Sequence, residues 1–159
     1  MKVAVLGTGG WGLTLGRVLF ENGNKVSFWT HSQEEVDLLN EFHEYKDKLP
    51  GVVFPKEFFY TTNMALALDG ADMVLIVVPS QFMDSVSKQL GRVNFSNKQK
   101  TIVVCEKITA LEVLEKALKE KGLQNHFVIV RDIVKDRKAV VDSVRDRVDN
   151  SEYKKYRYK

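Results

Sequence analysis

The chain has 159 residues, of which 44% are hydrophobic and 28% charged, and its formal net charge is +3. This length suffices for one buried core and excludes two full-sized domains. No run of about 18 apolar residues occurs, so we expect no membrane-spanning helix. The N-terminus leads directly into a glycine loop rather than into a cleavage site, so we expect a cytoplasmic protein with one compact domain and an appendage.

The distribution of charge and of metal-ligating residues excludes several function classes. Residues 131–159 contain 10 of the 24 basic side chains but 6 of the 21 acidic ones. So modest an excess is typical of a solvated surface, and nucleic acid is not an expected partner. The single cysteine, Cys105, lies in an apolar run that predicts a buried strand thiol. His31, His43 and His126 lie on separate predicted elements, so we expect no metal site.

The first part of the chain alternates apolar runs with segments of helical period. This alternation predicts an α/β fold, a Rossmann-type doubly wound parallel sheet with helices on both faces. The first expected elements are a strand over residues 2–6, a helix over residues 11–22 that Gly23 ends, and a strand over residues 25–29. Ser32 and Glu35 have the spacing of a capping box, which predicts a second helix from that point.

The middle of the chain is irregular before the alternation resumes. Residues 42–61, with Leu-Pro-Gly-Val at 49–52 and Pro55, predict a loop that crosses the sheet edge. After it we expect, in chain order, a helix over 63–69, a strand over 72–79, a helix over 80–90 and a strand over 101–105. A further helix is expected from Thr109, which forms a capping box with Glu112, and a last strand over 126–130. The run at 72–79 is continuously apolar, which predicts a doubly buried strand at the centre of the sheet.

The last 29 residues differ in character from the rest. Apolar side chains recur at helical spacing across residues 133–148 of an otherwise charged segment, which predicts a C-terminal amphipathic helix. Its apolar stripe needs a partner, and the sequence leaves open whether this is the domain's own sheet, a second copy in a homodimer, or a further domain. We therefore divide the chain into a dinucleotide-binding domain at 1–130 and a charged helical tail at 131–159, with no full substrate domain.

A glycine motif, Gly7-Thr8-Gly9-Gly10-Trp11-Gly12, joins the first strand to the first helix. This is the position in which G-x-G-x-x-G binds a dinucleotide. Gly7 permits the turn, Gly9 lets the backbone approach a pyrophosphate, and Gly12 lets the helix pack against the strand. Amides at the start of the helix then face the phosphate charge, so the motif predicts a site for NAD or NADP.

The acid that completes this fingerprint is absent from the end of the second strand. A carboxylate is expected there, about 20 residues after the glycines, to bind the ribose 2′-hydroxyl of NAD. The sequence instead has Trp29-Thr30-His31-Ser32. With no carboxylate to repel a 2′-phosphate and with His31 available to bind one, NADP is at least as well favoured as NAD. His31 is equally consistent with an ordinary exposed loop histidine.

Five short motifs occur in a recognisable order and spacing over residues 1–105. They are Val5-Leu6-Gly7-Thr8-Gly9-Gly10-Trp11-Gly12, Glu21-Asn22-Gly23, Phe28-Trp29-Thr30-His31, Leu49-Pro50-Gly51-Val52 and Val77-Val78-Pro79-Ser80-Gln81. In combination they resemble the N-terminal domain of the bacterial-type glycerol-3-phosphate dehydrogenases. The resemblance implies an oxidoreductase that interconverts dihydroxyacetone phosphate and sn-glycerol 3-phosphate with NAD or NADP.

The resemblance also implies roles for individual residues. Gly10 and Trp11 would contact the cofactor phosphates through their backbone amides, and His31 would lie beside the adenosine ribose. Pro79 would line the nicotinamide side of the crevice, and Lys107 would touch both the cofactor and a triose phosphate substrate. An ammonium just past the carboxyl end of a strand suits that substrate, although composition alone would make Lys107 a surface lysine.

The sequence departs from the family beyond this lysine. Ile108 replaces the family's glycine after Lys107, and Arg131-Asp132-Ile133 replaces its Ser-Gly-Pro turn. The family's helical C-terminal domain, with a second lysine and an Arg-Asn pair, has no counterpart, so we expect an NAD(P)H-binding domain that is catalytically incomplete alone. Two alternatives remain, a non-enzymatic NAD(P)-sensing module that acts through residues 133–148 and a small Rossmann reductase completed across a dimer.

Overall fold

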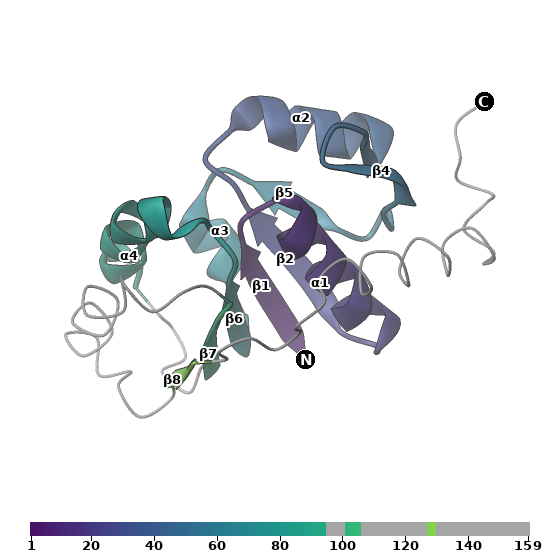
Figure 1. Cartoon of the computed structure of the whole chain (residues 1–159). Coiled ribbons are helices and arrows are strands. Elements are labelled where there is room, and N and C mark those ends of the chain that lie inside the picture. Colours follow the sequence, from purple (N-terminus) through teal and green to yellow (C-terminus); the bar gives the residue numbers. More distant parts are fainter. Residues whose placement is uncertain (95–100, 106–126, 130–159) are drawn as a thin grey trace.

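The computed structural model describes residues 1–94, 101–105 and 127–129. Six strands form one sheet covered by helices on both faces (Figure 1). The strands are β1 (Lys2–Leu6), β2 (Lys25–Trp29), β5 (Phe59–Thr61), β6 (Met73–Ile76), β7 (Thr101–Val104) and β8 (Phe127–Ile129). They lie in the order β5-β2-β1-β6-β7-β8, and every neighbouring pair is parallel. The predicted doubly wound Rossmann sheet is therefore confirmed.

The helices of the described residues begin and end close to the predicted positions. They are α1 (Gly10–Glu21), α2 (Gln33–Phe42), α3 (Met64–Leu68), the 3₁₀ turn η1 (Ser80–Phe82) and α4 (Met83–Arg92). Gly23 has φ +83°, a left-handed conformation, and its N–H donates to the carbonyl of Phe20 at 2.9 Å. It therefore ends the first helix as expected. The Asn63 side chain caps α3 by accepting from the N–H of Leu66.

Alternate side chains of β1 enter two different cores. Val3 and Val5 pack on one face of the sheet with residues of α1, whereas Ala4 and Leu6 pack on the other with residues of α3 and α4. All four are fully buried. This double burial is why the central strands are continuously apolar. The strand expected at the centre, β6, does lie beside β1 in the middle of the sheet, and the Cys105 thiol is buried as expected.

The prediction of a loop across the sheet edge at residues 42–61 is wrong for the parts of this segment that form strands. The segment forms a small antiparallel pair, β3 (Glu44–Tyr45) and β4 (Leu49–Val53), followed by β5 at the edge of the main sheet. The register of the pair shifts, and Gly51 has φ +80°. Strands this short and irregular leave no period-two pattern in the sequence. Their stability comes from tertiary packing, since Phe58 and Tyr60 bury their rings against Phe28.

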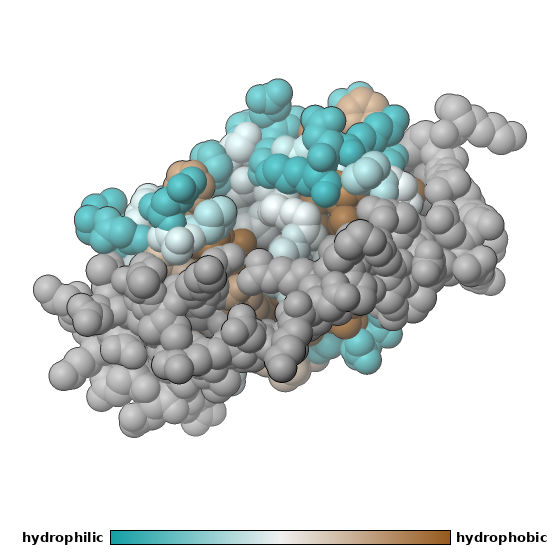
Figure 2. Space-filling view, in the orientation of Figure 1, coloured by the Kyte–Doolittle hydropathy of each residue, from teal (hydrophilic) through white to brown (hydrophobic). Residues whose placement is uncertain are grey.

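Several predictions lie outside the described residues. These are Lys107, the helix from Thr109, the tail at 131–159 with its amphipathic helix, and a homodimer formed through residues 133–148. In the part of the chain that the structure describes, no helix has the length and hydrophobicity to cross a membrane. The outer surface of α2 is largely hydrophilic, and hydrophobic surface shows mainly in the hollows between elements (Figure 2).

Candidate nucleotide-binding site

A cavity of about 440 Å³ opens at the carboxyl ends of β1, β2 and β6. Its walls come from the glycine loop, the end of β2, the first turn of α2, the residue before β4, the segment after β6, and α4. The lining residues are Gly7, Thr8, Gly9, Trp29, Thr30, His31, Glu35, Lys48, Val77, Val78, Pro79, Phe82, Ser85, Val86 and Gln89. The chain order of the strands reverses between β1 and β6. Open parallel sheets bind ligands at such a switch point.

The glycines of the loop have two different roles, since some are required by close backbone packing and another leaves space for a ligand. Gly7 has φ +120°, and a Cβ there would lie 2.2 Å from the carbonyl oxygen of Val77. A Cβ on Gly12 would lie 2.3 Å from the carbonyl oxygen of Gly7. Around Gly9, by contrast, no atom of the described residues apart from its two chain neighbours lies within 4 Å of the position of a Cβ. The fold therefore requires two of the glycines, while the third leaves open space on the cavity side.

The N-terminus of α1 is arranged to receive an anion. Gly9 is the N-cap and has no side chain with which to cap the helix, and no acidic residue occurs in the first turn. These amides and the helix dipole together favour negative charge. Gly10 and Trp11, for which phosphate contacts were predicted, stand in this first turn. The Trp11 side chain packs partly buried against the core and does not line the cavity.

His31 and Pro79 both line the cavity, His31 from the segment after β2 and Pro79 from the segment after β6. Pro79 follows β6 and is the residue before η1. The His31 ring stacks on the ring of Phe82, with centroids 6.2 Å apart and an interplanar angle of 26°. Phe82 was not among the predicted site residues, although it lies directly after the Val-Pro-Ser-Gln motif and is 46% exposed. The two rings therefore contribute aromatic surface to the lining of the cavity.

The structure brings a carboxylate to the end of β2, although the sequence has none at that position. Glu35, in the first turn of α2, lines the cavity. Its Oε2 accepts a hydrogen bond from Thr30 Oγ1 at 2.7 Å and another from Thr8 Oγ1. The strand end itself carries no acid, as the sequence indicated, but the fold brings one to Thr30 from the first turn of α2.

Only half of the predicted capping box forms around Ser32. Ser32 Oγ accepts from the N–H of Glu35 at 3.2 Å, as the spacing predicts. The N–H of Ser32, however, donates to Thr30 Oγ1 at 3.3 Å. The Glu35 carboxylate is thereby released from its usual capping role and turns toward the cavity.

The other oxygen of Glu35 meets a lysine. Lys48 Nζ lies 2.5 Å from Glu35 Oε1, and Tyr45 Oη donates to the same oxygen at 3.0 Å. Burial alone would raise the pKa of the Glu35 carboxyl, but hydrogen bonds from Lys48, Thr8 and Thr30 and the charge of Lys48 outweigh it and lower the pKa to about 2. Glu35 is therefore ionised at neutral pH and paired with a cation.

Among the described residues, no three His, Cys, Asp or Glu side chains cluster closely enough to hold a metal ion. The arrangement instead combines an uncapped helix N-terminus, an exposed aromatic pair and a paired carboxylate around one cavity. Those are features that suit a phosphate-bearing aromatic ligand.

Comparison with known sequences identifies what this chain is similar to. A family profile described as "NAD-dependent glycerol-3-phosphate dehydrogenase N-terminus" matches residues 2–144. The glycerol-3-phosphate dehydrogenase [NAD(P)+] of Bacillus velezensis is 43% identical over 88 residues, which are 55% of this chain and 26% of that protein. The enzyme of the same name from Fusobacterium nucleatum is 32% identical over 130 residues, 78% of this chain and 38% of that protein. The chain thus spans well under half the length of these relatives.

Solved structures show the same fold at lower identity. The glycerol-3-phosphate dehydrogenase of Coxiella burnetii superposes with a TM-score of 0.70 at 23% identity, covering 87% of this chain and 43% of that one. A UDP-D-ManNAc dehydrogenase of Pyrococcus horikoshii reaches 0.64 at 13% identity, covering 92% and 44%. At such identities the likeness establishes only the fold, which hosts more than one dehydrogenase activity.

Proposed function

Because this chain belongs to the NAD-dependent glycerol-3-phosphate dehydrogenase family, whose N-terminal part it matches, we propose that it binds NAD or NADP in the cavity at the carboxyl edge of its sheet. The single observation that carries the proposal is the glycine loop, which leaves open space at Gly9 beside an uncapped helix N-terminus. The cofactor pyrophosphate lies against the first turn of α1 in this proposal. The adenine lies toward His31 and Phe82, and the nicotinamide toward Pro79.

The residues present fit a dinucleotide on physical grounds. The first-turn amides of α1 supply hydrogen-bond donors to the pyrophosphate without an acidic side chain to compete for them. Phe82 and His31 supply ring surface for a base. On the side of β6, Val77, Val78 and Pro79 form an apolar wall. Such a wall excludes water from the nicotinamide side.

We further propose that the activity in which this domain takes part is the interconversion of dihydroxyacetone phosphate and sn-glycerol 3-phosphate, since the relatives bear that enzyme's name. When bound, the nicotinamide supplies the hydride. The residues of this chain bind and orient the cofactor. The proposed contact of Lys107 with cofactor and substrate depends on residues outside the described part of the chain.

For a polypeptide of these 159 residues we expect cofactor binding with little or no turnover. Hydride transfer needs the nicotinamide, the carbonyl carbon and a proton donor held together. The described residues provide a place for the first of these only. Binding without turnover would equally suit the sensing module, whereas steady turnover by a dimer would favour the small reductase.

The test is a titration of the purified chain with NADH and with NADPH, followed by nicotinamide fluorescence. Gly9→Asp should abolish binding of both, because its carboxylate would stand at the pyrophosphate. Asn40→Asp adds the same charge at an exposed position of α2 outside the cavity, and it should bind as the wild type does. Addition of dihydroxyacetone phosphate then reports turnover as a loss of nicotinamide absorbance. Unchanged affinity in the Gly9→Asp chain would refute the proposed site.

A further inference from the structure

Glu35 joins three separate segments of the chain, the glycine loop, the end of β2 and the β3–β4 hairpin, through its two carboxylate oxygens. Oε2 accepts from Thr8 in the glycine loop and from Thr30 just past β2, and Oε1 accepts from Tyr45 in β3 and Lys48 just before β4. We propose that Glu35 is a positioning residue for the cofactor, one that holds the glycine loop and Lys48 in place around the phosphate site. The inference rests on the proposed function, and it assigns Glu35 a role that the glycine motif does not include.

The hydrogen bonds of Glu35 argue against direct reading of a ribose. An ionised carboxylate offers about four lone-pair positions. Two donors occupy each oxygen, so the protein itself fills these positions. An acid at the end of a second strand, by contrast, keeps its oxygens for the 2′-hydroxyl. Glu35 also lies near the end of the second strand, but its oxygens accept hydrogen bonds from protein side chains.

The bond to Thr8 fixes the part of the loop with the most backbone freedom. Thr8 lies between Gly7 and Gly9 and is 3% exposed. Glycines on both sides allow the peptide to adopt many conformations, only some of which direct amides at a phosphate. The Thr8 hydroxyl, held by Glu35, selects one of them before any ligand arrives. Such preorganisation lowers the entropy lost on binding.

The ion pair with Lys48 places a cation beside the start of α1. A Cβ on Gly10 would lie 3.1 Å from the carbonyl oxygen of Lys48, so this segment passes directly over the first helical turn. The Lys48 ammonium also lies 4.6 Å from the centroid of the Tyr45 ring. Held there, it cancels the charge of Glu35, which unpaired would repel the phosphates.

The experiment compares Glu35→Ala and Glu35→Gln with Glu34→Gln, a neighbouring exposed glutamate of the same helical turn that does not line the cavity. Glu35→Ala should weaken NADH and NADPH by the same factor, about tenfold or more, because the pyrophosphate site is common to both. Glu35→Gln keeps the shape but loses the ion pair, so its loss should be smaller. Glu34→Gln should match the wild type.

The ratio of the two affinities separates positioning from direct reading. If Glu35 reads the ribose, Glu35→Gln should shift the preference toward NADPH, since a charge that opposes the 2′-phosphate is removed. If its role is structural alone, the variants should melt at lower temperature but bind as the wild type does below that temperature. Either result would overturn the positioning role. Glu35→Gln and Lys48→Met keep the test available if Glu35→Ala does not fold.

Hydrogen exchange of the ligand-free chain gives a second readout. Amides of residues 8–12 should exchange faster in Glu35→Ala, while those of β6 should not change. Unchanged exchange in the loop would contradict the proposal. A wild-type chain that binds neither cofactor would overturn the proposed function and the positioning role with it. A wild-type chain that binds while Glu35→Ala binds equally well would overturn the positioning role alone.

Discussion

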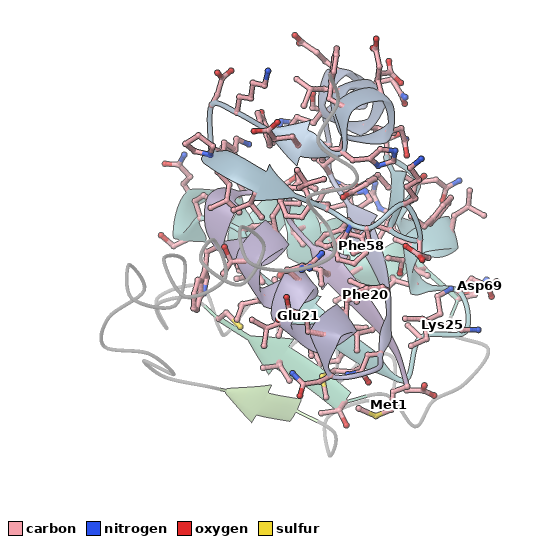
Figure 3. All side chains as sticks on the ribbon, turned by 90° about the vertical axis from the view of Figure 1, so that its right-hand side faces the viewer. Met1, Phe20, Glu21, Lys25, Phe58 and Asp69 are labelled. Carbon is pink, nitrogen blue, oxygen red and sulfur yellow. The ribbon has the colours of Figure 1, made fainter. Side chains whose placement is uncertain are left out.

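The two edges of the sheet carry hollows of similar size and opposite character. The one at the amino ends of β1, β2 and β5 measures about 570 Å³ and is larger than the 440 Å³ cavity at the carboxyl ends. Its residues are Lys2, Phe20, Lys25, Val26, Ser27, Glu57, Phe59, Leu66 and Asp69. Figure 3 labels three of them, Phe20, Lys25 and Asp69. If volume alone marked a ligand site, this hollow would be the stronger candidate.

The difference lies in what the backbone presents at each edge. In a parallel sheet the loops from strand to helix gather at the carboxyl edge, so the N-terminus of α1 faces that cavity. The same helix presents its C-terminal end, near Phe20, to the amino-edge hollow, where the dipole disfavours anions. One of the charged groups there is also engaged internally, because Lys2 Nζ donates to the backbone carbonyl of Asp69. Fixed backbone donors, rather than size, distinguish the candidate site.

The largest effect should follow from a methyl group at the carboxyl edge. Gly12→Ala places a Cβ 2.3 Å from the Gly7 carbonyl oxygen, a backbone atom that cannot move without opening the glycine loop. We expect the variant to lose about 2 to 4 kcal/mol of unfolding free energy and all measurable NADH binding. Urea denaturation and fluorescence titration would measure the two effects.

Gly9→Ala is the matched control for this substitution. Its Cβ would enter open space, and the backbone at φ −65° and ψ 166° is allowed for alanine. Stability should stay the same or rise slightly, because alanine restricts the unfolded chain. If the Gly12→Ala chain were as stable as the Gly9→Ala chain, the backbone between Gly7 and Gly12 would be able to move and accept the added methyl group, contrary to this prediction.

The second prediction concerns acid. The pKa of Glu35 is lowered from 4.5 to about 2, so its carboxylate contributes stability that is complete above about pH 4.5 and is lost as the pH falls from there toward 2. We expect that contribution to be on the order of 2 kcal/mol, after a discount for the partly exposed Lys48. The unfolding free energies of the wild type and Glu35→Gln should therefore approach each other below about pH 4.5 and converge only as the pH nears 2.

A pair on the surface of α4 provides the contrast. Asp84 and Lys88 lie 2.8 Å apart, but both side chains are more than half exposed. Asp84→Asn should change the acid dependence very little, because exposed pairs contribute at most about 1 kcal/mol. Equal effects of Asp84→Asn and Glu35→Gln would mean that the network around Glu35 adds nothing beyond a surface ion pair.

How far the sequence predicts this molecule depends on how local each feature is. The strands β1 and β6 are buried on both faces of the sheet, so nearly all their residues are apolar and each strand is recognisable in the sequence as a continuous apolar run. The turn at Gly7 and the N-terminus of α1 are likewise encoded within six consecutive residues. The bounds of β1 and α1 were predicted to within one residue, whereas β6, expected over residues 72–79, spans only Met73–Ile76.

What could not be predicted is set by contacts between distant residues. Strand β5 is three residues long, and its position beside β2 is fixed by tertiary packing. The carboxylate of Glu35 meets Thr8 and Lys48, which lie 27 and 13 residues away along the chain. No periodicity links residues at such separations. The sequence therefore indicated no carboxylate at the end of β2, whereas the fold brings the carboxylate of Glu35 there from α2.

The third prediction tests the aromatic wall of the carboxyl-edge cavity. Phe82 is 46% exposed and stacks on His31, so its ring is available to a base without supporting the core. Phe82→Ala should weaken NADH and NADPH alike by about tenfold, the value of one stacked aromatic contact. Melting temperature should hardly change. Ser85→Ala, on the same wall, removes only a hydroxyl and serves as the control.

The smallest effect should come from the larger hollow. Phe59 is 46% exposed and Lys25 is exposed, and both line the amino-edge hollow at the opposite ends of their strands from the glycine loop. The double variant Lys25→Gln/Phe59→Ser removes a cation and an apolar surface there, yet the first-turn amides of α1 and the Glu35 network remain untouched. We expect NADH and NADPH affinities within about twofold of the wild type and a stability change under about 1 kcal/mol. A tenfold loss of affinity in this variant would show that the amino edge takes part in cofactor binding. The two hollows would then be two parts of one binding site, and the N-terminus of α1 would no longer distinguish a binding edge from a non-binding edge.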